Sequence, residues 1–121
     1  SVNFLEHDIL QTWPQTFPDK IQILISNPPY IAQNEMQGLD PEVLNFEPHI
    51  ALSDNSNGLT FYKRLFDICA SDEAPRCEYL FLEMSGVLHR KIVEMANHYK
   101  FTSVEVKNDL TNIPRVLKVK V

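Results

Sequence analysis

Residues 21–33 read "IQILISNPPYIAQ", and the fold can be worked out from this stretch. Apolar residues dominate its first half, as in a short strand buried inside a sheet. The strand stops at Asn27, and Pro28 and Pro29 follow directly. Because a proline fixes its own φ and keeps the preceding residue extended, this segment of backbone is stiff. We predict a buried strand over residues 21–26 that runs into a rigid polar turn.

Other stretches with strand patterns are the first half of "VNFLEHDIL" (2–10), "EYLFLEM" (78–84), "TSVEVK" (102–107) and "RVLKVKV" (115–121). The runs at 21–26 and 78–84 resemble central strands buried on both faces. The last two alternate apolar and polar residues, which predicts an antiparallel pair with one face in water.

Helical spacing predicts helices within residues 58–70 and 86–100. Their apolar stripes consist of Leu59, Tyr62, Leu65, Phe66 and Cys69 in the first and Val87, Leu88, Ile92, Met95 and Tyr99 in the second. We expect an α/β domain whose mixed sheet ends in an antiparallel strand pair.

Composition narrows the class of protein. The hydrophobic fraction is 44%, and no apolar run approaches the roughly 20 residues that span a bilayer, so we expect no membrane partner. Sixteen acidic and eleven basic residues give a net charge of −5, whereas proteins that bind nucleic-acid phosphates usually carry a basic surface. The charge therefore argues against a nucleic-acid partner. Cys69 and Cys77 have no companions at metal-ligand spacing. We therefore expect two free thiols in a reducing compartment and no metal.

Residues 32–58 form a long connection that retains many apolar residues. A connection of this length in a compact domain is usually functional or disordered, and its apolar content argues against full disorder. We expect an ordered flap, with a short helix over "DPEVLNF" (40–46), beside the carboxyl end of the first strand. Ligands of open α/β sheets bind at that edge.

The "NPPY" sequence at residues 27–30 suits one kind of ligand. The side-chain oxygen of Asn27 and the carbonyl of Pro28 are acceptors on stiff backbone, and together they match the two donors of a planar NH2 group. Tyr30 adds an aromatic face for a flat amide or base. The alternative is a simple turn, since Asn and Pro are common turn formers.

In context, "NPPY" after a buried strand is the motif of amino-directed methyltransferases. From end to end the chain resembles the C-terminal part of the release-factor glutamine methyltransferases, the PrmC/HemK family. The further matches, in order, are "NFEPHIAL" (45–52), Gly58 with "LTFYKRL", "FLEMSG" (81–86) and "NDLTNIPRVLKV" (108–119).

The resemblance implies a Rossmann-like class I methyltransferase fold that uses S-adenosyl-L-methionine. It implies methyl transfer to the side-chain amide of a glutamine in a loop of a peptide chain release factor. Asn27, Pro28 and Tyr30 would be catalytic, Pro29 and Glu47 would join them in binding the substrate, and Asn27 would also contact the cofactor. Family members work in the bacterial cytoplasm and in eukaryotic organelles or cytosol, so the expected compartment is cytoplasmic or mitochondrial.

Asp8 and its backbone neighbour Ile9 would contact the adenine of the cofactor by the same resemblance; alternatively, Asp8 only caps a turn. Glu47 has an equally plausible reading as an ordinary flap carboxylate. Arg115 is better explained as an ion-pair partner of Asp109 than as a catalytic group. The aromatic residues of both predicted helices are expected in the core.

The chain also departs from the family. Its three glycines leave no glycine-rich turn for the cofactor, and the family's N-terminal helical domain has no counterpart. We expect residues 1–121 to be a partial catalytic domain that starts at about the third strand and is inactive alone. Two other interpretations remain open: an amino methyltransferase acting on adenine in DNA or RNA, and a non-catalytic methyltransferase-like subunit.

Overall fold

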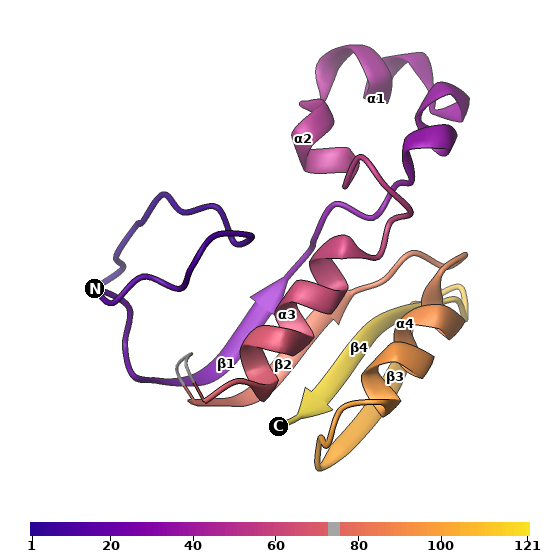
Figure 1. The fold of residues 1–121 in the computed structure, drawn as a ribbon. Coiled ribbons are helices and arrows are strands. Elements are labelled where there is room, and N and C mark those ends of the chain that lie inside the picture. The colour runs from indigo at the N-terminus through magenta and orange to yellow at the C-terminus, as the bar shows by residue number, and fades with distance from the viewer. Residues whose placement is uncertain (73–75) are drawn as a thin grey trace.

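A mixed β-sheet forms the centre of the structure (Figure 1). The computed structural model describes residues 1–72 and 76–121. In these residues the strands are β1 (Lys20–Ser26), β2 (Arg76–Glu83), β3 (Ser103–Asn108) and β4 (Pro114–Lys120), arranged in the order β1-β2-β4-β3. β1 and β2 are parallel, whereas β4 is antiparallel to both β2 and β3. The predicted α/β fold with a terminal antiparallel pair is confirmed.

Two longer helices follow the first two strands. α3 (Thr60–Ala70) connects β1 to β2, and α4 (His89–Asn97) connects β2 to β3, so both predicted helices are confirmed. Val87 was expected on the buried stripe of the second, but it precedes α4 and is exposed. Within the residues described, no helix is both long and apolar enough to cross a bilayer.

The long connection between β1 and α3 is ordered. It contains a 3₁₀ helix, η1 (Gln33–Gly38), and two short α-helices, α1 (Pro41–Phe46) and α2 (His49–Leu52). The helix expected over residues 40–46 is confirmed as α1, with Asp40 as its N-cap residue and Pro41 at its first position. Figure 1 shows these helices beyond the carboxyl ends of β1 and β2, and we call residues 32–58 the flap.

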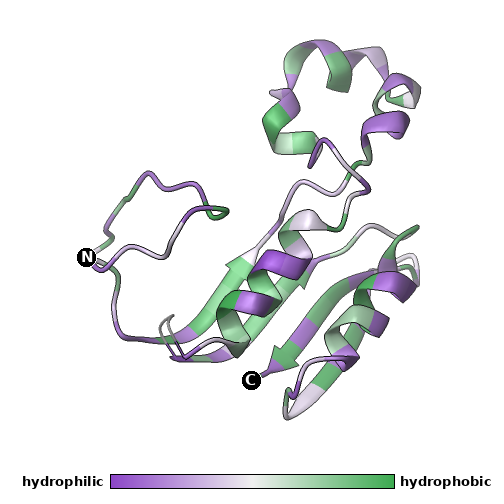
Figure 2. Cartoon of the chain, viewed as in Figure 1, coloured by the Kyte–Doolittle hydropathy of each residue, from purple (hydrophilic) through white to green (hydrophobic). Residues whose placement is uncertain are grey.

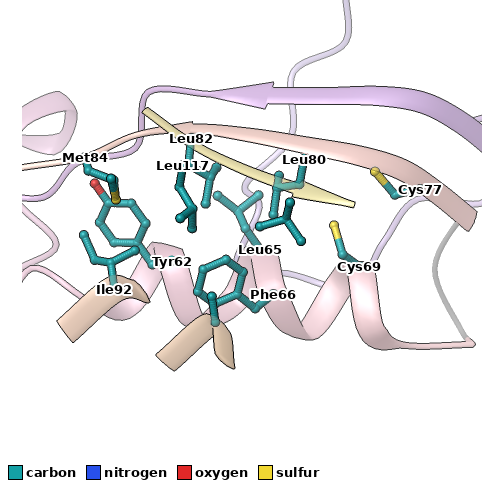
Figure 3. Close-up of a cluster of buried hydrophobic side chains, with 12 residues drawn as sticks. Tyr62, Leu65, Phe66, Cys69, Cys77, Leu80, Leu82, Met84, Ile92 and Leu117 are labelled. Atoms are coloured by element: carbon teal, nitrogen blue, oxygen red, sulfur yellow. The ribbon is translucent and has the colours of Figure 1, made fainter. Parts of the chain in front are cut away.

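The core lies between one face of the sheet and the two longer helices (Figure 3). Leu80 and Leu82 of β2 lie opposite Val119 and Leu117 of β4 and are fully buried. The helices contribute Tyr62, Leu65, Phe66 and Ile92, and Met84, directly after β2, is fully buried among them. Figure 2 shows the same concentration of hydrophobic residues along β1, β2 and β4. The predicted stripe of the first helix is therefore the one that packs on the sheet.

The opposite face of the sheet is apolar along β1 but lacks a covering helix in the described chain. Ile23 and Ile25 lie beside Tyr79 and Phe81 in the parallel register, and their exposed fractions are 53% and 74%. β1 also pairs only with β2 among the described strands. The prediction that residues 21–26 form a central strand buried on both faces is thus wrong for this chain: the apolar pattern is there, but one face and one edge are uncovered.

The strand predicted in the first half of residues 2–10 is also wrong. Residues 1–19 contain neither helix nor strand, and Phe4 is 91% exposed. A strand needs the backbone groups of a neighbouring strand, because its own cannot pair with one another. In the described chain this segment pairs with no strand of the sheet, so its β-type composition does not form one.

The β3–β4 hairpin turn is organised by one carboxylate. Oδ1 of Asp109 accepts hydrogen bonds from the backbone N–H groups of Thr111 and Ile113 at 2.9 and 3.0 Å. Its Oδ2 lies 3.4 Å from Nε of Arg115. The expectation that Arg115 pairs with Asp109 is confirmed. The bond from Ile113, followed by those from Thr111, lowers the pKa of Asp109 to about 2.

This lowered pKa predicts an acid-sensitive hairpin. The folded pKa lies below the ordinary value of 3.8, so the contribution of Asp109 to stability is present above about pH 4 and is lost as the pH falls towards 2. An NMR titration of the Asp109 carboxyl carbon should give a midpoint near 2. Asp109→Asn should remove the Asp109 share of the acid-unfolding transition. A midpoint at the ordinary value would contradict the turn geometry.

The two thiols should be unreactive in the folded chain. Cys69 of α3 and Cys77 of β2 are free and buried, and their sulfur atoms face each other in Figure 3. Burial raises the pKa of both thiols, so the reactive thiolate is scarce. Iodoacetamide should leave the native chain unlabelled and add two groups in concentrated guanidinium chloride, as mass spectrometry can measure. Rapid labelling of the native chain would show that the 69–77 contact is open in solution.

Candidate functional site

The "NPPY" residues lie where expected, directly after β1 at the carboxyl end of the parallel strands. The backbone beyond them is tied to the far end of the flap. Ile31 donates its N–H to the carbonyl of Leu52 at 2.9 Å and forms a parallel bridge with Ser53, while Gln33 donates to Ser56 at 3.0 Å. The two ends of the flap therefore support each other at the site.

Asn27 is available for a ligand. Pro28 is buried, Pro29 is half-buried, and the Asn27 side chain is exposed. Among residues 1–72 and 76–121, the Asn27 side chain has no hydrogen-bond partner. A polar amide without a protein partner, on backbone fixed by two prolines, can offer its oxygen to a donor without first breaking an internal bond.

Gly58 lies tightly against the backbone of Tyr30. Its φ is +81°, a value that L-residues with a side chain rarely adopt. A Cβ at this position would overlap the carbonyl oxygen of Tyr30 and would lie 2.7 Å from Cδ1 of Leu88. The turn before α3 can therefore rest against "NPPY" only because residue 58 is glycine.

The Asp54 carboxylate stabilises the same turn through hydrogen bonds to its backbone. Its Oδ1 accepts from the N–H groups of Ser56 and Gly58, both at 2.9 Å, and its Oδ2 accepts from the N–H of Thr60 at 3.0 Å. The last bond satisfies a free donor at the start of α3. Burial alone would raise the pKa of Asp54, but the hydrogen bonds from Thr60, Gly58 and Ser56 outweigh it and lower the pKa. The carboxylate thus remains ionised and keeps the turn closed.

Tyr30 lies in a polar cluster at the ends of β2 and β4. Burial, followed by the negative charge of Glu83, raises the pKa of Tyr30, and the positive charge of Arg115 acts in the opposite direction. Tyr62 of α3 donates its hydroxyl to the backbone carbonyl of Glu83 at 2.8 Å. The charges of Glu83 and Arg115 therefore act on the Tyr30 hydroxyl in opposite directions.

Two hollows open beside "NPPY". One, of about 250 Å³, lies at the end of β1 and is lined by Ser26, Asn27, Pro28 and Leu65 among others. The second, of about 520 Å³, extends towards the N-terminal segment and the flap. Ile9, Pro29 and Phe61 line both hollows, so these three side chains form a shared apolar wall.

Phe61 is a site residue that sequence reasoning missed. Aromatic residues of the first helix were expected in the core, which is right for Tyr62 and Phe66 but wrong for Phe61. Its place in the first turn of α3, three residues after Gly58, was the available signal, because helix starts at this edge of a sheet face ligands. Asp54 was missed as well, although Asp and Asn in "SDNSNG" are typical of a turn.

Asp8 and Ile9 are brought to the site. Both line the larger hollow together with Pro29. The turn-capping interpretation of Asp8 is also realised, since its Oδ1 accepts from the N–H of Leu10 at 2.9 Å. Its second oxygen stays available to a ligand, so the cap and an adenine contact are compatible.

Glu47 is not brought to "NPPY". It follows α1, its side chain is exposed, and it lines neither hollow. The flap reaches the larger hollow through Ile50 of α2 and through Ser53, Asp54 and Asn55. In the described part of the chain, no cluster of three His, Cys, Asp or Glu residues could hold a metal ion.

No protein-family model matches the chain. Curated proteins do match it, and three of them are each named release factor glutamine methyltransferase. The protein of Flavobacterium psychrophilum is 29% identical over 119 residues, which cover 98% of this chain and 41% of the relative. That of Fusobacterium nucleatum is 31% identical over 120 residues, 99% of this chain and 33% of the relative. That of Cereibacter sphaeroides is 32% identical over 111 residues, 92% of this chain and 40% of the relative.

The chain resembles release factor glutamine methyltransferases over nearly its whole length. The resemblance expected from "NPPY" and the matches that follow it is confirmed. The chain spans only 33–41% of the length of these three relatives. The activity and substrate of these whole proteins can therefore only be proposed for this chain.

Gly58→Ala should destabilise the chain and disturb "NPPY" together. Placing an L-residue at positive φ costs roughly 1–2 kcal/mol, and the overlap with the Tyr30 carbonyl adds to that cost. Urea unfolding should show a loss of about 2 kcal/mol or more, and the NMR signals of residues 27–31 should shift. The matched control is Gly38→Ala, where a Cβ meets nothing within 4 Å. Equal effects of the two changes would contradict the close approach.

Proposed function

We propose that this chain is the substrate-binding part of an S-adenosyl-L-methionine-dependent methyltransferase that modifies a glutamine side chain of a peptide chain release factor. The observation that carries the proposal is the exposed Asn27 amide, which has no hydrogen-bond partner in the described chain and lies on rigid backbone, where it lines one of two hollows that share an apolar wall. The names of the relatives support the substrate.

The chemistry of a glutamine amide fits these residues. Its nitrogen is a poor nucleophile because the lone pair is delocalised into the carbonyl group. Catalysis therefore depends on orientation and on acceptors that face the positive charge developing on the nitrogen. Asn27 Oδ1 and the Pro28 carbonyl would accept the two N–H donors, and the ring of Tyr30 would support the amide plane. No general base is needed before the bond forms.

The larger hollow fits the adenosine part of the cofactor. Ile9 and Phe61 offer apolar walls to a flat base, and the second oxygen of Asp8 can accept from an amino group. Asn27 lies at the end of the adjoining hollow, where it would contact both the cofactor and the substrate. When bound, the cofactor supplies the methyl group as an electrophile. Glu47 would contact the substrate only where the bound release factor extends past the flap.

We further propose that residues 1–121 form one part of a larger catalytic domain and are inactive alone. Two observations support this proposal. Ile23 and Ile25 expose an apolar face of β1, and the chain spans less than half the length of its relatives. A sheet face of that character is normally covered by packed helices. The glycine-rich turn of the class I methyltransferases would belong to the remainder.

The partner and the compartment follow from the same resemblance. A glutamine-containing loop of the release factor would enter beside Tyr30, at the base of the flap. The three relatives come from bacteria, so of the cytoplasmic and mitochondrial alternatives we propose the cytoplasm.

Replacing Asn27 with alanine in the complete enzyme tests this function. Because Asn27 would act mainly as charge develops on the amide nitrogen, Asn27→Ala should lower kcat roughly 100-fold or more. The Kd of the cofactor should change far less, since Ile9 and Phe61 hold its base. Transfer of tritiated methyl groups to purified release factor gives kcat, and calorimetry gives the Kd.

The matched control is Asn34→Ala, which removes another exposed amide from η1. It should leave both quantities near the wild-type values. Turnover close to that of the wild type in Asn27→Ala would contradict the proposed role of "NPPY" in methyl transfer. Methylation of DNA or RNA adenine in place of the release factor by the wild-type enzyme would favour the nucleic-acid alternative.

A further inference from the structure

Arg64 joins the N-terminal segment to the helical layer. Its Nε donates to the carbonyl of Ile9 at 2.8 Å, and its Nη2 donates to the carbonyl of Gln11 at 2.6 Å. More than 50 residues separate the donor from each acceptor along the chain. The guanidinium group presents its donors in a fixed fork, so it can hold two carbonyls in one orientation. Hydrogen bonds from a charged donor are also stronger than those between neutral groups.

The acceptors of Arg64 belong to a turn that is closed on itself. Asp8 accepts from the N–H of Leu10 through its side chain and from the N–H of Gln11 through its carbonyl, both at 2.9 Å. These bonds fix the internal shape of turn 8–11. They do not fix where the turn lies, because both partners are in the turn. The bonds from Arg64 attach this unit to α3.

The side of α3 that faces the N-terminal segment follows helical spacing. Phe61, Arg64 and Ile68 recur at three and four residues, so they share one side of the helix. Phe61 lines both hollows of the candidate site, whereas Arg64 and Ile68 line a separate hollow of about 270 Å³ with Leu10 and Trp13. Arg64 therefore lies behind the wall made by Ile9 and Phe61 and does not face the ligand space itself.

We propose that Arg64 is a positioning residue, which holds the Asp8–Ile9 wall against α3 and so sets the width of the hollow for the cofactor's base. This inference rests on the proposed function, because it takes the larger hollow as the adenosine site. The "NPPY" end is held separately, by Gly58 and by the Ile31–Ser53 bridge. Loss of Arg64 should thus weaken cofactor binding and leave the transfer step intact.

Trp13 gives a direct readout of the attachment. It is the chain's single tryptophan, it is half-buried, and it lines the same hollow as Arg64. In the 121-residue chain, Arg64→Gln should shift the Trp13 emission to longer wavelength and increase its quenching by acrylamide. Glutamine keeps a good helix former at this position, so circular dichroism should show α3 intact. Unchanged emission and quenching in Arg64→Gln would overturn the attachment.

Kinetic measurements on the complete enzyme test the effect of Arg64 on cofactor binding. Arg64→Gln should raise the KM for S-adenosyl-L-methionine on the order of tenfold, the loss expected for one charged hydrogen bond, while kcat at saturating cofactor stays within about twofold. Arg64→Lys should give an intermediate KM, because an ammonium group cannot reproduce the fork. The matched control is Lys63→Gln, which removes the neighbouring charge from an exposed pair with Asp67 and should change neither KM nor Trp13 quenching.

The outcomes separate the two proposals. If the wild-type enzyme transfers no methyl group to the release factor, the proposed function fails. If the wild type is active and Arg64→Gln keeps its KM, or loses kcat instead, the positioning role of Arg64 is wrong while the proposed function stands.

Discussion

The contact between Gly58 and the carbonyl of Tyr30 is the constraint on which the candidate site depends. It brings the turn that starts α3 against the rigid residues that end β1, so the two sides of the crossover meet at the carboxyl edge of the sheet. Asp54 closes that turn by accepting three backbone N–H groups. The Ile31–Ser53 bridge then fixes the base of the flap. Without a glycine at residue 58, these local bonds could form, but not in the place where they support Tyr30.

Much of this arrangement could be predicted from sequence because it follows from local rules. Alternation in residues 102–107 and 115–121 predicted the antiparallel pair, and the spacing of Tyr62, Phe66 and Cys69 predicted the buried side of α3. The position of "NPPY" follows from the end of β1. The support of the site was harder to predict, since the contacts of Gly58, Phe61 and Arg64 join segments distant in sequence.

The wrong predictions share one physical cause. Apolar composition records the surface that a segment can bury, but it does not say whether a neighbour is present to bury it. Ile23 and Ile25 fit a strand covered on both faces, and Phe4 fits a strand with a paired edge, yet all three are exposed in the described chain. Each exposed apolar group forgoes the roughly 1.5–3 kcal/mol that burial of such a side chain provides. The sheet is therefore less stable than its sequence would allow with both faces covered.

The two ends of the candidate site are held by different kinds of contact, and this difference affects how easily each end can move. At the "NPPY" end, stiffness resides in the backbone: two prolines, a glycine at positive φ and a parallel bridge. Backbone of this kind has few alternative conformations, which suits a group that must aim a hydrogen bond. At the other end, turn 8–11 is attached through a long arginine side chain, whose bonds can break and re-form without refolding of the chain. Motion is thus easier at the wall formed by Ile9 than at Asn27, so the hollow can widen while the backbone of residues 27–30 keeps its direction.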